Sequence, residues 1–189
     1  GISNPSDMEQ AIEMGLDAVK FFPAVPSGGL SMIKALAAPY HTMRFMPTGG
    51  VTPQNLTEFL DYPKILACGG TWMVKPELLA TGNFEEITRL TRQTVRTMLD
   101  LKIDELTLPF PHTGNNLSDV LHGLINLSSG STKELTISCR YLKRTIYHLE
   151  KNGATFRYDN AKYDSAGNMD AIDFSDAPEE FSIRLIEKH

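Results

Sequence analysis

A single lysine lies in an otherwise apolar stretch near the start of the chain. Lys20 lies within "AVKFF", residues 18–22, which has the composition of a buried strand ended by Pro23. One interpretation is structural, with the aliphatic stem buried and the ammonium reaching water or a counter-charge. The other is chemical, because a partly desolvated lysine loses proton affinity and its free amine can attack a carbonyl to form a Schiff base. The pattern alone leaves both open.

Two pairs of glycines end the next two apolar segments of the chain. One is "TGG" at residues 48–50 and the other is "CGGT" at residues 68–71. Glycine has no Cβ, so its backbone N–H can approach an anion closely, and the neighbouring threonines add hydroxyl groups. Strand-to-helix turns also use glycine for geometry alone, but two pairs after a lysine-bearing strand favour a phosphate-binding site. The residues that this pattern selects are Thr48, Gly49, Gly50, Gly69, Gly70 and Thr71.

The elements that position these residues alternate between helix and strand over about the first 100 residues. Helices are predicted over residues 6–15, 29–38, 51–62 and 83–99, and strands over 18–22, 43–46 and 64–70. Short apolar strands joined by helices are typical of a parallel sheet that is covered on both faces. Lys20 and the glycine pairs fall at or just after the carboxyl ends of these strands, where (β/α)-barrels build their active sites.

Capping residues set the expected helix boundaries. Ser6 and Glu9 have the spacing of a capping box, and Gly15 stands where that helix would stop. Thr52 followed by Pro53 is a favoured entry into the third helix, because proline suits the first helical position. The fourth helix is expected to follow the cap Asn83 and to place on one face Ile87, Leu90, Thr94 and Met98.

The pattern changes near residue 100, where a domain boundary divides the chain into residues 1–99 and 100–189. Strands are predicted over 101–110, 134–139, 154–159, 169–174 and 181–187, helices over 115–127 and 140–153, a loop over 128–133 and a turn over 164–168. The last helix and the four strands around it give a β-α-β-β-β order. The second part of the chain is therefore expected to be an α+β module.

Composition and charge restrict the class of protein. The 189 residues are 41% hydrophobic and carry a formal net charge of -5, so nucleic acid is not an expected partner. Cys68 and Cys139 are far apart and not in CxxC spacing, which favours a reducing cytoplasm over a disulfide scaffold. No apolar run approaches the roughly 20 residues that cross a bilayer, and we recognise no signal peptide, so no membrane partner is expected.

Three segments resemble the 2-keto-3-deoxy-6-phosphogluconate aldolases, also called 4-hydroxy-2-oxoglutarate aldolases. They are "PSDMEQAIEMGLDAVKFFPA", "RFMPTGGVTPQNL" and "ILACGGTWMV", and the resemblance covers roughly residues 1–98. It implies the last part of a (β/α)8 TIM barrel, with Lys20 as the Schiff-base lysine and Phe22 lining the substrate pocket. The threonine and glycine residues selected above would bind a phosphate or the distal carboxylate of the substrate. The implied reaction is reversible cleavage of a keto acid to pyruvate plus an aldehyde, without metal or organic cofactor.

The chain also departs from this family. Its barrels have eight strands, and "GIS" at residues 1–3 resembles the end of the fifth. The glutamate that moves protons, and the arginine and threonine that hold the pyruvate carboxylate, have no counterpart here. A three-stranded parallel sheet would leave an apolar edge unpaired. We therefore expect the chain to be inactive alone, as a fragment or a truncated product, and to require a partner, such as a second copy in a homo-oligomer.

The second part resembles the vicinal-oxygen-chelate, or glyoxalase-like, modules. The segments "TIYHLEKNGATFRYDNAKYDSAGNMDAIDF" and "FSIRLIEK" carry this similarity. Strand positions that hold metal ligands in that superfamily are occupied here by Glu105, Glu134 and Arg184. Arginine has no lone pair to donate and repels a cation, so no metal is expected. The histidines, which show no ligand spacing, are His41, His112, His122, His148 and His189.

The leading hypothesis is a class I aldolase in which Lys20 forms the Schiff base and the glycine turns hold the anionic end of a pyruvate-derived keto acid. Phosphogluconate-type and hydroxyglutarate-type substrates remain open, because both place an anion at that end. The alternative is a non-enzymatic product whose glyoxalase-like part is a binding or oligomerisation module. A metal-dependent lyase in the second part would require a divalent metal to copurify.

Overall fold

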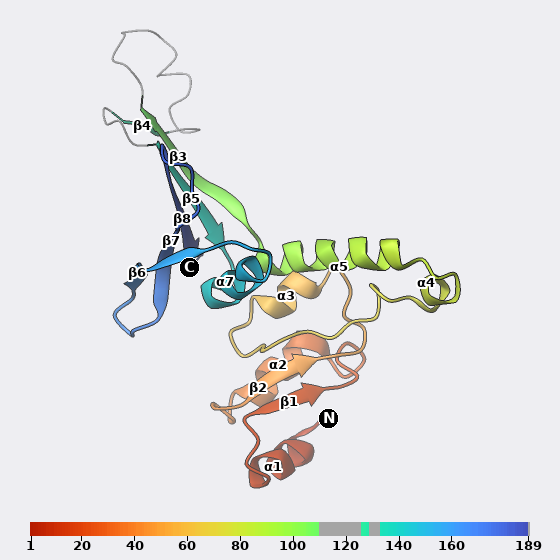
Figure 1. Cartoon of the computed structure of the whole chain (residues 1–189). Helices are drawn as coiled ribbons and strands as arrows, with labels where there is room; N and C mark the ends of the chain where they lie inside the picture. The colour runs from red at the N-terminus through yellow and green to blue at the C-terminus, as the bar shows by residue number, and fades with distance from the viewer. Residues whose placement is uncertain (110–125, 129–132, 189) are drawn as a thin grey trace. The chain divides into compact units, whose positions relative to one another are not determined.

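The computed structural model describes residues 1–109, 126–128 and 133–188. These form two compact units, Gly1–Met98 and Leu99–His189, which are described separately (Figure 1). The elements of the first unit are α1 (Pro5–Glu13), β1 (Ala18–Phe21), α2 (Gly29–Ala37), β2 (Arg44–Pro47), α3 (Leu56–Leu60), α4 (Pro76–Ala80) and α5 (Phe84–Leu99). Apart from α4, which the sequence did not indicate, each helix and both strands lie where the hydrophobic pattern predicted them.

The sheet of the first unit is parallel, as predicted, and β1 and β2 lie side by side in Figure 1. The expected third strand is reduced to two isolated bridges, from Phe45 to Ile65 and from Thr48 to Gly69. The reason lies in Pro47. Phe45 donates its N–H to the third segment, but Pro47, the next residue facing that segment, has no N–H to donate. The ladder is therefore interrupted where a regular strand would continue.

Alternation along the two strands separates a buried face from an exposed one. Val19, Phe21 and Phe45 are buried, whereas Lys20 and Met46 alternate with them and are exposed. Because parallel sheets normally have both faces covered, the exposed face is unusual. The largest fully buried side chains of this unit belong to Met8, Phe21, Ile33, Met43, Phe45 and Leu60.

Helix α1 begins differently from the prediction. Its N-cap is Asn4, whose Oδ1 accepts the N–H of Asp7 at 3.0 Å, and the Asp7 carboxylate accepts the N–H of Ser3 at 3.0 Å. The predicted capping box of Ser6 and Glu9 is therefore wrong. Asparagine caps a helix as well as serine does, and Pro5 suits the first helical position.

Helix α3 also starts later than predicted. The side chain of Asn55 accepts the N–H of Thr52 at 2.8 Å and donates to the carbonyl of Gly50 at 3.1 Å. These bonds hold residues 52–55 in a turn, so the helix begins at Leu56 rather than at Pro53. The predicted cap of α5 is confirmed, because Asn83 Oδ1 accepts the N–H of Glu86 at 3.2 Å.

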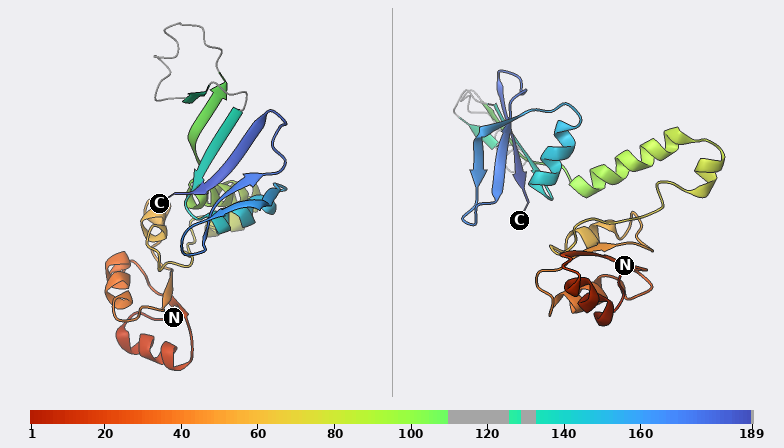
Figure 2. Two further views of the ribbon diagram at one scale, coloured as in Figure 1. Left: turned by 90° about the vertical axis from the view of Figure 1, so that its left-hand side faces the viewer. Right: turned by 60° about the horizontal axis from the view of Figure 1, so that its bottom comes forward.

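The second unit is a six-stranded sheet with one helix. Its elements are β3 (Lys102–Pro109), β4 (Asn126–Ser128), β5 (Lys133–Cys139), α7 (Leu142–Glu150), β6 (Phe156–Tyr163), β7 (Met169–Phe174) and β8 (Phe181–Glu187). The strand order is β4-β3-β5-β8-β7-β6, and Figure 2 shows α7 beside these strands. The elements from β5 to β8 follow the predicted β-α-β-β-β order.

The helix predicted over residues 115–127 lies outside the described residues except at its end. Asn126 and Leu127 belong to β4 rather than to a helix. The turn predicted over residues 164–168 is confirmed, since the Asp164 carboxylate accepts the N–H groups of Ala166 and Asn168, each at 2.8 Å. Among the helices of the described ranges, none has the length and apolar character needed to cross a membrane.

Candidate active site

Lys20 lies on the exposed face of the β1–β2 sheet, and its side chain is accessible. It lines a groove of about 330 Å³ beside β1, together with residues of α1 and with Gly1 and Ile2. Within the part of the chain that the structure describes, the Lys20 ammonium has no hydrogen bond and no ion pair. A small molecule can therefore reach the Nζ atom.

Phe22 contacts both Lys20 and the first glycine turn. The Nζ atom of Lys20 lies 4.9 Å from the centroid of the Phe22 ring, within the range of a cation–π interaction. The same ring lies over Gly49, where a Cβ atom would be 3.1 Å from Cε2 and 3.2 Å from Cδ2 of Phe22. The structure thus brings together three of the predicted site residues, from the ends of two neighbouring strands.

The turn at Gly49 and Gly50 depends on glycine. The φ angles are +92° and +82°, in the left-handed region that other residues rarely adopt. A Cβ atom at Gly50 would also lie 2.6 Å from the Cβ of Val25. Two backbone bonds join this turn to the segment after β1, from Ala24 N–H to Thr48 O at 2.8 Å and from Val25 N–H to Gly49 O at 3.0 Å. The turn is therefore fixed relative to Lys20.

The predicted anion-binding residues differ in whether their N–H groups are available. The N–H of Gly69 donates to Pro47 O at 2.9 Å, and that of Thr48 donates to Phe21 O at 3.0 Å, so the sheet uses both. No acceptor within the described residues takes the N–H groups of Gly49, Gly50, Gly70 and Thr71. The donors open to an anion are fewer than the sequence pattern suggested, and they come from both turns.

The two threonine hydroxyls also differ. Thr48 Oγ1 is buried without a hydrogen-bond partner among the described residues, and a Cβ atom at Gly69 would lie 2.7 Å from it. Thr71 is exposed. The Thr71 hydroxyl is thus accessible in this structure, whereas that of Thr48 faces the neighbouring strand segment.

Sequence reasoning missed two residues that shape the glycine turns. Val25 packs on Gly50, and the ring of Trp72 occupies the space beside Gly70, where a Cβ would lie 1.5 Å from ring atom Cζ3. The motif "GGTW" shows that a large side chain follows the glycines. It does not show that the chain folds the ring back onto Gly70, because this depends on the conformation of the loop.

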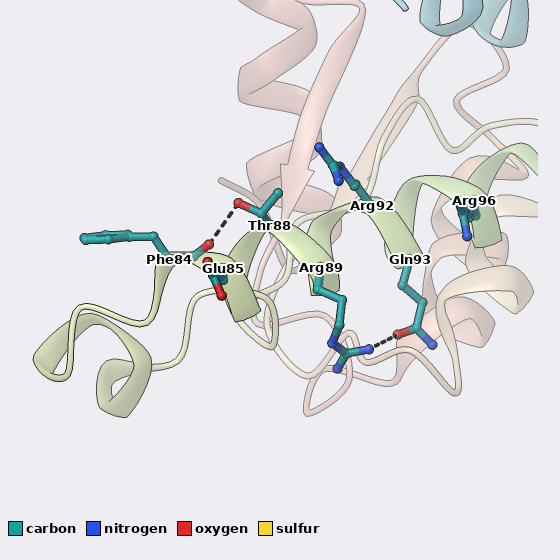
Figure 3. Close-up of a pocket in the computed structure, with 7 residues that line it drawn as sticks. All are labelled: Phe84, Glu85, Thr88, Arg89, Arg92, Gln93 and Arg96. Atoms are coloured by element: carbon teal, nitrogen blue, oxygen red, sulfur yellow. Dashed lines mark hydrogen bonds between the residues drawn. The ribbon is translucent and has the colours of Figure 1, made fainter.

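A larger hollow of about 820 Å³ follows the exposed side of α5 (Figure 3). All seven residues that line it belong to this one helix. Arg89 is held by Glu86 through two N–O contacts of 2.7 Å, which reduces the positive charge of the surface. We assign no site to it.

Glu105, Glu134 and Arg184 are the positions at which the glyoxalase-like superfamily carries metal ligands. All three lie on one face of the second sheet. The strand register aligns Glu105 with Thr136, Thr136 with Arg184, and Arg184 with Asp173. Glu134 is two residues from Thr136 along β5 and so shares its face. The three predicted positions are therefore on one face, as neighbours of a central arginine.

Arg184 is paired within this row. Its Nε donates to Asp173 Oδ1 at 2.8 Å. Burial alone would raise the pKa of Asp173, but the hydrogen bonds and charge of Arg184 outweigh it and lower the pKa. No group of three or more His, Cys, Asp or Glu residues in the described part of the chain could hold a metal ion. His41 and His148 are the described histidines, and His112, His122 and His189 lie outside the described residues.

Comparison with known proteins shows similarity to aldolases in the first half of the chain. The sequence model of the KDPG and KHG aldolase family matches residues 1–90. The 2-dehydro-3-deoxy-phosphogluconate aldolase of Haemophilus influenzae is 50% identical over 95 residues, which are 50% of this chain and 45% of that protein. The enzyme of the same name from Treponema pallidum is 47% identical over 96 residues, 51% of this chain and 46% of that protein.

Two further comparisons cover the same half. The KHG/KDPG aldolase of Escherichia coli K12 is 39% identical over 95 residues, 50% of this chain and 45% of that protein. The solved structure of KDPG aldolase from Legionella pneumophila is 34% identical, with a TM-score of 0.49 over 50% of this chain and 46% of that chain. This chain thus spans about half the length of the curated relatives it matches. Residues 1–90, which carry Lys20 and both glycine turns, are therefore similar in sequence to the KDPG and KHG aldolases.

Proposed function

We propose that the first unit is the Schiff-base part of a class I aldolase that acts on a keto acid with an anionic tail. The observation that carries this proposal is the position of Lys20. Its accessible amine lies next to Phe22 and the Gly49 turn, within a sequence that matches aldolases. The names of the relatives supply the substrate class, which is 2-keto-3-deoxy-6-phosphogluconate (KDPG) or 4-hydroxy-2-oxoglutarate (KHG).

The chemistry follows from the amine. The neutral Nζ of Lys20 attacks the C2 carbonyl of the keto acid and releases water, which gives an iminium ion. The iminium withdraws the electron pair of the C3–C4 bond as that bond breaks. A base takes the proton of the C4 hydroxyl, and the aldehyde leaves. The remaining enamine is protonated at C3, and water then releases pyruvate and restores Lys20.

The anionic tail is expected at the glycine turns. The N–H groups of Gly49, Gly50, Gly70 and Thr71 have no acceptor among the described residues, so they can donate to a phosphate or a carboxylate. KDPG and KHG both carry an anion at the end far from the keto group. The turns therefore fix the orientation of the substrate but do not select between these two.

Borohydride trapping with pyruvate tests the assignment of Lys20. Pyruvate and borohydride should convert Lys20 to a stable secondary amine, detected by peptide mass spectrometry of the full chain, and Lys20→Arg should abolish the adduct. Lys34→Arg is the matched control, because the Lys34 ammonium also lies near an aromatic ring, 5.6 Å from the centroid of Tyr62. An adduct that survives in Lys20→Arg would contradict the assignment.

We expect the chain by itself to form the imine but to turn over slowly or not at all. Cleavage needs a group that accepts the C4 hydroxyl proton. Among the described residues, no carboxylate or imidazole is hydrogen-bonded to Lys20. Imine formation is therefore the step to measure in this chain, rather than the steady-state rate.

For the second unit we propose a glyoxalase-like module that acts in binding or oligomerisation rather than in metal catalysis. The β-α-β-β-β order supports this proposal, together with the position of Arg184 between Thr136 and Asp173 on the sheet face. Its pairing with Asp173 supplies local charge balance without a metal ion.

A further inference from the structure

Trp72 joins the second glycine turn to helix α5. It is the single tryptophan of the chain. Its indole Nε1 donates to Thr94 Oγ1 at 3.1 Å, and the Thr94 hydroxyl donates its own proton to the carbonyl of Leu90 at 2.9 Å. The threonine hydroxyl thus acts as both acceptor and donor, which fixes the direction of the indole N–H.

The indole ring and Gly70 occupy one another's space. A Cβ atom at Gly70 would lie 1.5 Å from Cζ3, 2.1 Å from Cε3 and 2.6 Å from Cη2 of Trp72. Any side chain at residue 70 would therefore displace the ring. The ring of Trp72 and the backbone at Gly70 therefore restrict each other's positions.

The packing around the ring is incomplete. Trp72 is partly buried against the core of the first unit, and it lines a cavity of about 60 Å³ with Pro53 and Leu56 and with Leu90 and Thr97 of α5. The hydrogen bond to Thr94 is the directional contact that orients the indole within this packing.

The backbone that Trp72 supports carries available donors. The carbonyl of Thr71 accepts the N–H of Val74 at 3.1 Å, which closes a turn, while the N–H groups of Gly70 and Thr71 have no acceptor among the described residues. Donors fixed before a ligand arrives bind an anion more tightly than mobile ones, because less conformational entropy is lost.

We propose that Trp72 is a positioning residue for the anion site, with Thr94 of α5 as its anchor. The proposal rests on the proposed function, since it concerns the same glycine turns. It assigns to α5 a role in the affinity for the anionic tail of the substrate. Pyruvate has no such tail, so its reaction with Lys20 should not depend on Thr94.

The test replaces Thr94 by valine, which keeps the shape of the side chain and removes the acceptor. Inorganic phosphate is titrated into the full chain, and the amide signals of Gly70 and Thr71 are followed by 1H–15N NMR together with Trp72 fluorescence. We expect Thr94→Val to bind phosphate about 5-fold more weakly, the effect of losing one hydrogen bond. Thr94→Ser should restore binding, and pyruvate trapping at Lys20 should be unchanged in both.

Thr91→Val is the matched control. Thr91 lies on the same helix, and its hydroxyl likewise donates to a carbonyl four residues earlier, that of Ile87 at 2.8 Å, whereas the indole of Trp72 bonds Thr94. It should bind phosphate like the parent chain. If Thr94→Val does not fold, Trp72→Phe removes the same N–H and is measured by NMR alone.

Two results would overturn the proposal. One is equal phosphate affinity in Thr94→Val and the parent chain, and the other is a parent chain whose Gly70 and Thr71 signals do not respond to phosphate. Neither depends on Lys20. Failure of the proposed function would appear separately, as absence of the pyruvate adduct in a chain that still binds phosphate.

Discussion

At the scale of single residues, the sequence pattern selected side chains that the structure brings together, but it did not reveal their hydrogen bonds. A lysine in an apolar strand and two glycine pairs selected the region that the structure assembles around Lys20, Phe22 and Gly49. The hydrogen bond from the Gly69 N–H to the carbonyl of Pro47 could not be predicted, because it depends on how the two segments pair. The hydrogen bond from the indole of Trp72 to Thr94 could not be predicted either, because it depends on the conformation of the loop.

The two cysteines differ in environment, which makes their reactivity predictable. Cys139 is fully buried, and burial raises the pKa of its thiol to about 11, so at pH 8 about one molecule in a thousand carries the thiolate. Cys68 is partly exposed. Iodoacetamide at pH 8 should alkylate Cys68 well before Cys139, as measured by peptide mass spectrometry over time. Equal alkylation rates of the two cysteines would show that Cys139 is not buried in solution.

At the scale of elements, periodicity located the helices, and local hydrogen bonds moved their starts. Asn4 and Asn55 both redirected a helix start by side-chain bonds to nearby N–H groups. The third strand was predicted from apolar composition, but the missing N–H of Pro47 interrupts its ladder. Composition can indicate a strand, but it does not reveal which donors its neighbour lacks.

The cap of α1 gives a direct test at this scale. Asn4→Ala removes the acceptor of the Asp7 N–H and should lower the free energy of unfolding by about 1 kcal/mol. Ser6 is the residue that the sequence pattern favoured as the cap. Ser6→Ala should change the free energy of unfolding much less, because Ser6 lies inside the helix and is exposed. Urea unfolding of both variants measures the difference. A larger loss of unfolding free energy in Ser6→Ala than in Asn4→Ala would show that Ser6, rather than Asn4, caps the helix.

At the scale of the whole molecule, the exposed face of the β1–β2 sheet carries several apolar side chains. Phe22, Met46 and Leu66 are 51%, 36% and 42% exposed, although parallel sheets are normally covered on both sides. Burying three such side chains would contribute several kcal/mol, at about 25 cal/mol per Å² of apolar surface. We expect a second copy of the chain to cover Met46 and Leu66 and to leave the Lys20 amine open to pyruvate.

Light scattering of the full chain measures this self-association. The parent chain should show a mass above that of one chain, and Met46→Lys should shift it toward the monomer because a charge would be buried in the contact. Met32→Lys is the matched control, since Met32 is 39% exposed on α2 and away from this face. A parent chain that stays monomeric at high concentration, or equal effects of the two substitutions, would exclude this interface.

We propose Lys20 as the nucleophile that forms a Schiff base with pyruvate. Its most direct measurement is the site of reduction after the full chain is treated with pyruvate and borohydride. We expect one adduct per chain, on the peptide that contains Lys20, with the other lysines unmodified. An absent adduct, or one spread over surface lysines such as Lys34 in proportion to their exposure, would contradict it.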